Sequence, residues 1–279
     1  NYIWEIATRK LSLLSRGEKQ RYATFSPNGD RVAFVRGNNV VVVDLSNGEE
    51  IQVTTDGVYN QIINGATDWV YEEEFGFDKA FFWSVDGGKI AFYRFDESEV
   101  VEFSMAKYGS LYPFEYKFKY PKAGEDNAKV SIHSYDLNTQ KTVAIDLGKD
   151  FEYIPRIQWT QNPELLSVHR MNRHQNELEL LLANANNGNS RVILTENCKT
   201  YVEVTDDLTF LKDKEKFIWS SDRSGFNHLY LYDMDGKLLN SITKGNWDVT
   251  NFLGCDEESG RVYYISAANK SEVGGGSNM

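Results

Sequence analysis

Short apolar runs separated by polar turns recur along the whole chain. In residues 25–54, FSPNGDRVAFVRGNNVVVVDLSNGEEIQVT, runs rich in Val, Ile and Phe alternate with turn pairs such as Asn28-Gly29 and Asn38-Asn39. Asn and Gly tolerate positive φ angles and are typical of tight hairpin turns, whereas β-branched and aromatic residues favour strands. The pattern therefore predicts antiparallel strands joined by hairpins.

A short motif, in which one aromatic residue is followed by a polar turn, repeats along the chain. Its copies begin at Phe25, Trp83 and Trp159, with weaker copies at Phe210 and Phe252, so that the spacings are 58, 76, 51 and 42 residues. A unit of about 40–50 residues with four short strands is typical of a β-propeller blade, and the longer gaps predict insertions. Five copies of the motif predict an all-β chain of about five blades, and these blades are expected to be part of a larger ring. The alternative fold is a β-sandwich with irregular loops.

Alternation within the strands predicts sheets that are apolar on both faces. In the run around Val32 and Phe34, apolar side chains point to both sides, as a blade packed between two neighbours requires. The chain holds 16 Phe, 16 Tyr and 6 Trp, which is 14% aromatic. We expect large rings to fill the wedge-shaped gaps between blades, in particular those of Phe25, Trp83, Trp159 and Trp219.

Composition narrows the range of functions. With 30 basic and 41 acidic residues the 279-residue chain has a net charge of −11, which argues against a nucleic-acid partner. The two cysteines, Cys198 and Cys255, allow one disulfide or two free thiols. No Cys or His cluster has zinc spacing, no Gly-rich loop opens a helix, and no apolar run is long enough to span a bilayer. We therefore expect no metal and no cofactor.

One segment breaks the blade pattern and carries the candidate chemistry. ATDWVYEEEFGF, residues 66–77, sets Glu72, Glu73 and Glu74 between large aromatic residues, and Asp68 is a good helix N-cap. A short helical insertion is therefore predicted near residues 68–78. Three adjacent carboxylates are usually a solvated acidic turn. If the aromatic flanks bury them in part, a cation must neutralise them, either an Arg of the protein or an ammonium group of a ligand.

Four separated stretches resemble one family in the right order. ATDWVYEEEFGF resembles the glutamate motif of the dipeptidyl peptidase IV family of serine exopeptidases. FYRFDESEV (92–100), YPKAGEDNAKV (120–130) and ITKGNWDVT (242–250) are also similar to that family. The chain looks closer to its bacterial members, for example in MNRHQNELELLLA (171–183). The resemblance covers nearly the whole chain.

The resemblance implies a fold, an activity and a site. The family's N-terminal propeller has eight blades and sits over an α/β-hydrolase domain, so residues 1–271 are expected to be a propeller fragment. Family members release X-Pro or X-Ala dipeptides from peptides with a free N-terminus. Glu73 and Glu74 match the two glutamates that hold the substrate's α-amino group, and the propeller gates the active-site cavity. A homodimer and a periplasmic or cell-surface location are further expectations from the family.

The catalytic residues are expected outside this chain. There is no G-x-S-x-G motif, and the four histidines, His133, His169, His174 and His228, do not pair with Ser and Asp in family order. The fragment should therefore be inactive without its hydrolase domain. The family also places a substrate-binding arginine before the position of Asn1. The segment EVGGGSNM, residues 272–279, departs from the family and is predicted to be a flexible linker or an added tail.

Two other classes of protein remain open on the sequence. The first is a non-catalytic β-propeller that binds a protein partner. The second is an endopeptidase or acyl-peptidase relative with the same two-domain plan. Those relatives lack adjacent glutamates, so Glu73 and Glu74 favour the exopeptidase.

Overall fold

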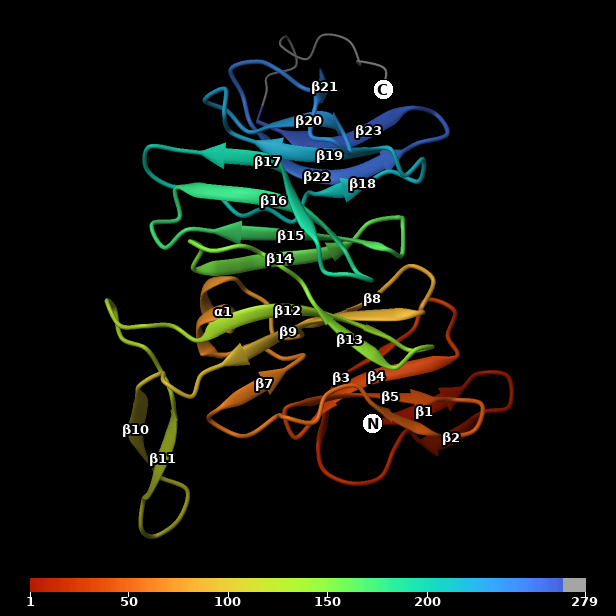
Figure 1. Ribbon diagram of the computed structural model, residues 1–279, viewed down its shortest axis with the longest axis vertical. Coiled ribbons are helices and arrows are strands. Elements are labelled where there is room, and N and C mark those ends of the chain that lie inside the picture. The colour runs from red at the N-terminus through yellow and green to blue at the C-terminus, as the bar shows by residue number, and fades with distance from the viewer. Residues whose placement is uncertain (268–279) are drawn as a thin grey trace. The chain divides into compact units, whose positions relative to one another are not determined.

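The computed structural model describes residues 1–267, and these fold as two compact units. Unit 1 comprises residues 1–145 with 185–188, and unit 2 comprises residues 146–184 with the chain from 189 onward. The regular elements of the described residues are 23 strands and one short helix, and all strand pairs are antiparallel (Figure 1). The all-β prediction is therefore confirmed.

Unit 1 is built from two large sheets and two hairpins. The four-stranded sheet has the order β3-β4-β5-β6, the five-stranded sheet has the order β13-β12-β9-β7 with β8 also on β9, and β1-β2 and β10-β11 are separate pairs. The elements are β1 (Tyr2–Glu5), β2 (Lys10–Leu13), β3 (Gln20–Phe25), β4 (Arg31–Arg36), β5 (Asn39–Asp44), β6 (Glu50–Gln52), β7 (Ile62–Asn64), α1 (Trp69–Glu74), β8 (Phe81–Trp83), β9 (Lys89–Asp96), β10 (Glu102–Lys107), β11 (Phe114–Lys119), β12 (Lys129–Asp136) and β13 (Lys141–Ala144).

Unit 2 contains two four-stranded sheets and one strand pair. The sheets have the orders β14-β15-β16-β17 and β18-β19-β20-β21, and β22 pairs with β23. The elements are β14 (Tyr153–Trp159), β15 (Leu165–Met171), β16 (Glu177–Asn184), β17 (Ser190–Asn197), β18 (Thr209–Phe210), β19 (Lys216–Ser221), β20 (His228–Asp233), β21 (Leu238–Ser241), β22 (Val249–Asp256) and β23 (Arg261–Ser266). Four consecutive strands that pair in sequence order form the blade predicted from the repeat.

The β4–β5 hairpin shows how the local sequence builds a blade. Arg36 pairs with Asn39, and the two turn residues between them, Gly37 and Asn38, both have positive φ angles of 56° and 60°. These angles are those of a type I′ turn, which matches the twist of the strands. The turn therefore lies one residue earlier than the predicted Asn38-Asn39 pair, because Asn39 already belongs to the ladder. All four central residues of β4 are buried, so both sheet faces are covered.

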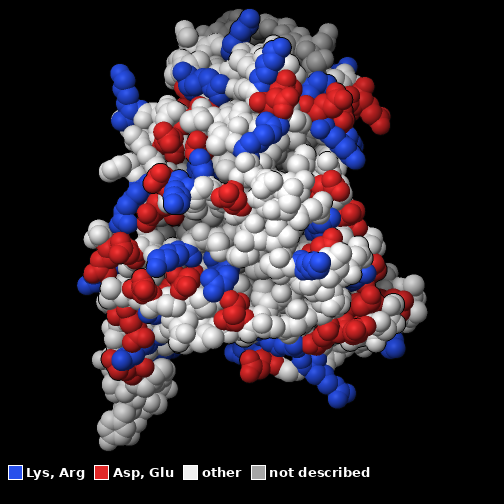
Figure 2. Space-filling view, in the orientation of Figure 1, with Lys and Arg blue, Asp and Glu red and all other residues white. Residues whose placement is uncertain are grey.

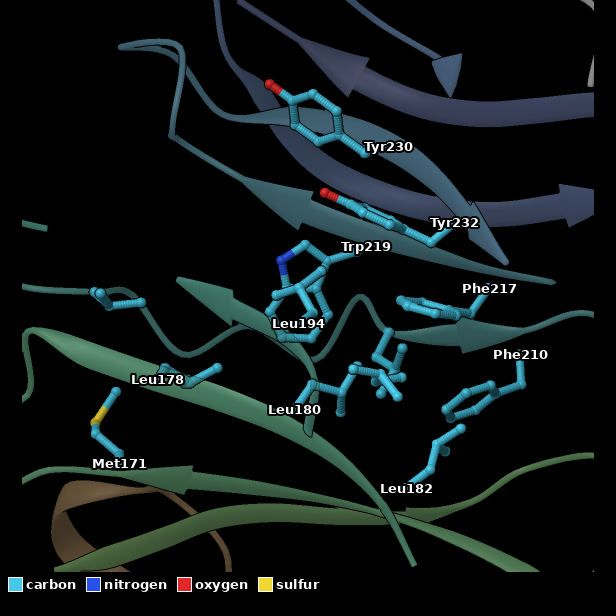
Figure 3. Close-up of a cluster of buried hydrophobic side chains, with 13 residues drawn as sticks. Met171, Leu178, Leu180, Leu182, Leu194, Phe210, Phe217, Trp219, Tyr230 and Tyr232 are labelled. Atoms are coloured by element: carbon cyan, nitrogen blue, oxygen red, sulfur yellow. The ribbon is translucent and has the colours of Figure 1, made fainter. Parts of the chain in front are cut away.

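Apolar side chains fill the space between the two four-stranded sheets of unit 2 (Figure 3). Met171, Leu178, Leu180 and Leu182 come from one sheet and meet Phe210, Phe217, Trp219, Tyr230 and Tyr232 of the other. Phe217 and Tyr232 stack with ring centroids 5.4 Å apart. The prediction that large rings fill the gaps between blades is confirmed for Trp219.

The other predicted wedge aromatics differ in their surroundings. Trp159 is buried, and Trp83 is half-buried with its indole N–H donating to the Thr24 carbonyl at 3.2 Å. Phe25 is 54% exposed, so its predicted packing role is wrong. It lies at the end of β3, beyond a register irregularity between Arg21 and Thr24. Such a bulge changes which face a side chain points to, and periodicity alone does not reveal it.

The longest gap in the repeat contains an inserted hairpin. Strands β10 and β11 pair along six residues each and stand away from the large sheets of unit 1 (Figure 1). Several large apolar residues on and around this hairpin are exposed, including Met105, Tyr108, Leu111, Tyr112 and Phe114. The insertion predicted from the 76-residue spacing is therefore present.

Three other sequence predictions bear on the fold. Cys198 and Cys255 are both free thiols. Within residues 1–267 no helix has the length and apolar character needed to cross a bilayer. The predicted tail at residues 272–279 lies outside the described residues.

Candidate functional site

The acidic motif lies in a closed insertion between β7 and β8. An isolated antiparallel bridge joins Ala66 to Lys79, and the Thr67 amide donates to the Asp78 carbonyl at 3.2 Å. Just outside this bridge, the Ala80 amide donates to the Gly65 carbonyl at 3.0 Å. The two ends of the insertion are therefore fixed to each other and to the sheet, and the helix between them has a defined orientation.

Helix α1 begins as the sequence predicts. Asp68 has extended backbone angles, and its Oδ1 accepts the Tyr71 amide at 3.0 Å, which is N-cap geometry. The Phe75 amide closes the last turn on the Tyr71 carbonyl at 3.2 Å. Gly76 follows with φ of +70°, which suits the residue that ends a helix. The predicted insertion near 68–78 thus contains a helix of six residues, Trp69–Glu74.

The aromatic residues of the motif anchor the helix. Tyr71 is 1% exposed, and its ring lies 4.8 Å from Phe95 and 5.0 Å from Phe75, measured between centroids. At the start of the helix, the Trp69 ring lies 4.4 Å from that of Tyr120 in an edge-to-face contact. These contacts fix one side of α1 against the rest of unit 1 and leave its other side exposed to solvent.

Glu73 and Glu74 are the last two residues of α1, and with Glu72 they are exposed. None of the three carboxylates forms an ion pair with a Lys or Arg among the described residues. The three carboxylates are not partly buried, so they need no cation of the protein to neutralise them. Solvation relieves the repulsion, because all three carboxylates are exposed although Tyr71 and Phe75 beside them are buried.

Two further carboxylates of unit 1 are buried. Asp68 is 7% exposed and Glu97, which directly follows β9, is 6% exposed. Burial raises the pKa of Asp68 to about 6, against the lowering effect of its hydrogen bond from the Tyr71 amide. Burial and then the Asp68 charge raise the pKa of Glu97 to about 7, whereas Lys119 lowers it. Sequence reasoning missed Glu97, because only the pairing of β9 with β7 brings it near the motif.

The histidines do not form a catalytic group. His174 is exposed, and His133 is near Ser131 at 2.9 Å on the same strand. His169 and His228 are buried in unit 2, where the His228 ring nitrogens lie 3.0 Å from Thr243 Oγ1 and from the Gly245 carbonyl. None has the Ser–His–Asp arrangement in the described part of the chain, and no group of three or more His, Cys, Asp and Glu side chains there is placed to hold a metal ion.

Unit 2 contains a cavity of about 240 Å³ that none of the predicted site residues lines. Its wall includes Glu196, Cys198 and Trp219. Glu196 accepts the indole N–H of Trp219 at 2.9 Å and is paired with Arg223. The buried carboxylate of this wall is therefore already neutralised within the protein.

Charges of both signs are interspersed over the visible face of the molecule, with no broad basic area (Figure 2). This distribution agrees with the net charge of −11 and gives a phosphate backbone no continuous basic surface on that face.

The sheets and the acidic insertion define a β-propeller chain with adjacent exposed glutamates on one short helix. The family described as "Dipeptidyl peptidase IV (DPP IV) N-terminal region" matches residues 1–273. The chain belongs to this family.

Known relatives agree with that assignment. The chain is similar to the crystal structure of Porphyromonas gingivalis dipeptidyl peptidase 4, with a TM-score of 0.90 and 42% identity over 95% of this chain and 38% of that one. It is 31% identical to the dipeptidyl-aminopeptidase B of Aspergillus niger, over 95% of this chain and 33% of that protein. A protein of Aspergillus fumigatus named "Probable dipeptidyl peptidase 4" is 31% identical over 97% of this chain and 37% of its own length. The chain thus spans between 33% and 38% of the length of these relatives.

Proposed function

We propose that this chain is the substrate-anchoring part of a serine exopeptidase that releases X-Pro and X-Ala dipeptides from peptides with a free N-terminus. In this proposal Glu73 and Glu74 bind the substrate's α-ammonium group, and the propeller narrows the access to the active site. One observation carries the proposal. The carboxylates of Glu73 and Glu74 are exposed and form no ion pair with a cation of the described residues, and they lie on a helix whose insertion is closed at both ends.

The chemistry of an α-ammonium group suits this pair. It carries three N–H donors, and its pKa of about 7.7–8.0 keeps it mostly charged at neutral pH. Glu73 and Glu74 are neighbours at the C-terminal end of α1, and their long side chains can each accept a charge-assisted hydrogen bond from one ammonium group. A fixed distance between this anchor and a nucleophile selects the bond after the second residue, which is catalysis by positioning.

The chain supplies no acyl-transfer chemistry in this proposal. A serine, with an aspartate and a histidine of an α/β-hydrolase domain, would attack the scissile carbonyl. We therefore expect the 279-residue chain alone to release no dipeptide, and expect the activity only in the protein that contains both domains.

The test compares free and N-acetylated X-Pro chromogenic substrates on the protein with its hydrolase domain. Glu73→Gln and Glu74→Gln should each lower kcat/KM for the free substrate, at a cost of about 2–5 kcal/mol, because the ammonium loses a charged partner. Glu72→Gln is the matched control on the same helix and should change little. Equal cleavage of the acetylated substrate by the wild-type protein would show that the amine-anchor role is wrong.

We also propose that the protein forms a homodimer through the β10–β11 hairpin. Leu111 at its tip is 91% exposed and Tyr112 is 78% exposed, which is unusual for large apolar residues clustered on one projecting element. Leu111→Arg should lower the mass of the particle measured by light scattering from dimer to monomer. A wild-type protein that is a monomer at every concentration would instead favour the alternative function, a propeller that binds another protein through this hairpin.

A further inference from the structure

The base of the β10–β11 hairpin contacts the helix that carries the glutamates. Tyr120 directly follows β11, and its ring lies 4.4 Å from that of Trp69, the first residue of α1, at an interplanar angle of 64°. Both side chains are half-buried. This contact therefore joins the two insertions that interrupt the blade pattern of unit 1.

Other rings of the hairpin hold Tyr120 in place. The Tyr120 ring lies 5.6 Å from that of Phe103 on β10 and 6.2 Å from that of Phe118 on β11. Phe103 and Phe118 pair across the hairpin, with ring centroids 5.7 Å apart. These contacts are tilted or edge to face, which are arrangements that aromatic rings favour. The Trp69 ring thus meets a packed group of rings, and Tyr120 is the member of that group next to α1.

Hydrogen bonds close the hairpin at the same end. The Tyr120 amide donates to the Val101 carbonyl at 3.0 Å, one position beyond the β10–β11 ladder. The Lys119 ammonium group donates to the Ser98 carbonyl at 3.1 Å and to the Val100 carbonyl at 2.7 Å. The base of the hairpin is therefore tied to the segment that follows β9, a strand of the five-stranded sheet.

A helix of only six residues depends on contacts of this kind. Helices of that length are not stable alone in water, so packing must determine the direction of α1. Trp69 and Glu73 are four residues apart, which makes them neighbours along the surface of the helix. Side chains of a helix lean toward its N-terminus, so Glu73 leans toward the turn that begins at Trp69. A shift of the Trp69 ring would therefore move the part of α1 from which Glu73 extends.

We propose that Tyr120 and Trp69 are positioning residues for Glu73, and that the base of the β10–β11 hairpin thereby sets the direction in which this carboxylate meets the substrate's amine. The inference deepens the proposed function and rests on it. Neither ring touches the amine in this scheme. Both act through the helix that carries the glutamates.

Hydrogen exchange tests the support of the helix without any ligand. Two amides report on α1, that of Glu72, which donates to the Asp68 carbonyl, and that of Phe75, which donates to the Tyr71 carbonyl, each at 3.2 Å. In the protein with its hydrolase domain, we expect Tyr120→Ala to make their exchange about threefold to tenfold faster, because one aromatic contact is lost.

Two further variants serve as controls for this measurement. Tyr120→Phe keeps the ring and should keep the wild-type exchange rates. Tyr116→Ala removes a ring from the same hairpin whose contact is with Phe118, at 5.5 Å, and it should also leave the exchange of α1 unchanged. Unchanged exchange of both α1 amides in Tyr120→Ala overturns the proposal.

Kinetics on the same protein test the link to the substrate. Tyr120→Ala should lower kcat/KM for a free X-Pro chromogenic substrate about threefold to tenfold, mainly by raising KM, because the contact with the ammonium group is made in the ground state as well. Tyr120→Phe should keep the wild-type value. The rate at which the catalytic serine reacts with a fluorophosphonate that carries no amino group should not change. An equal loss in both reactions would indicate general damage and overturns the positioning role.

A double-mutant cycle identifies the glutamate through which Tyr120 acts. The loss caused by Tyr120→Ala should disappear in a Glu73→Gln background, since the carboxylate that the rings position is gone, and should persist in Glu74→Gln. Additive losses from Tyr120→Ala and Glu73→Gln overturn the proposal. If exchange responds to Tyr120→Ala but neither glutamate variant changes kcat/KM, the proposed amine site is wrong, whereas the support of α1 by Tyr120 is upheld.

Discussion

His169 provides a test of how burial affects the acid stability of unit 2. The side chain is 3% exposed, and neither ring nitrogen has a hydrogen-bond partner among the described residues. Its ring meets that of Trp219 edge to face, with centroids 5.3 Å apart. Burial lowers the pKa of His169 from 6.5 to about 3, Arg156 adds to the lowering and Asp206 opposes it. The folded protein therefore holds this imidazole neutral where the unfolded chain protonates it.

The size of the effect follows from these two pKa values. The pKa of His169 is lower in the folded state than in the unfolded state. Its contribution to the free energy of unfolding is therefore fully present above pH 6.5 and is lost as the pH falls toward 3. Between pH 7 and pH 5 the loss is about 2 kcal/mol, and over the whole interval it approaches about 5 kcal/mol. In His169→Phe a ring of similar shape remains beside Trp219, no polar atom is left unpaired, and this loss should disappear.

Urea denaturation at pH 7 and pH 5, followed by tryptophan fluorescence, measures the difference. The wild-type free energy of unfolding should fall by about 2 kcal/mol more than that of His169→Phe between these pH values. His174→Gln removes an exposed histidine and should behave as the wild type does. If the wild type and His169→Phe lose the same stability to within about 0.5 kcal/mol, the neutral buried imidazole is not the cause of the acid sensitivity.

Two substitutions in unit 2 test packing and backbone geometry. Phe217→Ala should lower the free energy of unfolding by about 3–5 kcal/mol in urea denaturation, because this fully buried ring lies in the core between two sheets, whereas Leu238→Ala on the surface should cost less than about 1 kcal/mol. Gly236 has φ of +83°, and a Cβ there would lie 1.7 Å from the Ile193 carbonyl oxygen. Gly236→Ala should therefore lower the melting temperature more than Gly29→Ala, which has a similar φ of +76° but open space around it, and equal losses would contradict the steric argument.

Much of the fold follows from local sequence. Hairpin turns are encoded by residues that tolerate positive φ, and the strands by apolar runs of the right length, so the blades were predictable from the repeat. Helix α1 was also predictable, because the Asp68 cap and the aromatic residues that bury one side of it lie within the motif itself. The local sequence determines these turns, strands and the helix, and tertiary packing keeps them as the local sequence predicts.

The features that the sequence missed or left open depend on contacts between distant residues. Glu97 is close to Asp68 only because β9 pairs with β7, with Asp96 opposite Ile62. The exposed position of Phe25 depends on the irregular register of β3, and the exposure of Glu72–Glu74 depends on which side of α1 meets the sheet. A single sequence gives the order of polar and apolar residues, and it does not give the register of strands far apart in the chain.

The carboxylates in and near the acidic motif differ in their burial, and this difference has a physical consequence. Glu73 and Glu74 are exposed, so a cation can reach their carboxylates without a desolvation cost to these two side chains. Asp68 at the N-cap of α1 and Glu97 after β9 are buried, so water screens them less than it screens the surface carboxylates. Negative charge on Asp68 strengthens the hydrogen bond that caps and orients α1, because an ionised oxygen is the better acceptor and the N-terminus of a helix favours negative charge.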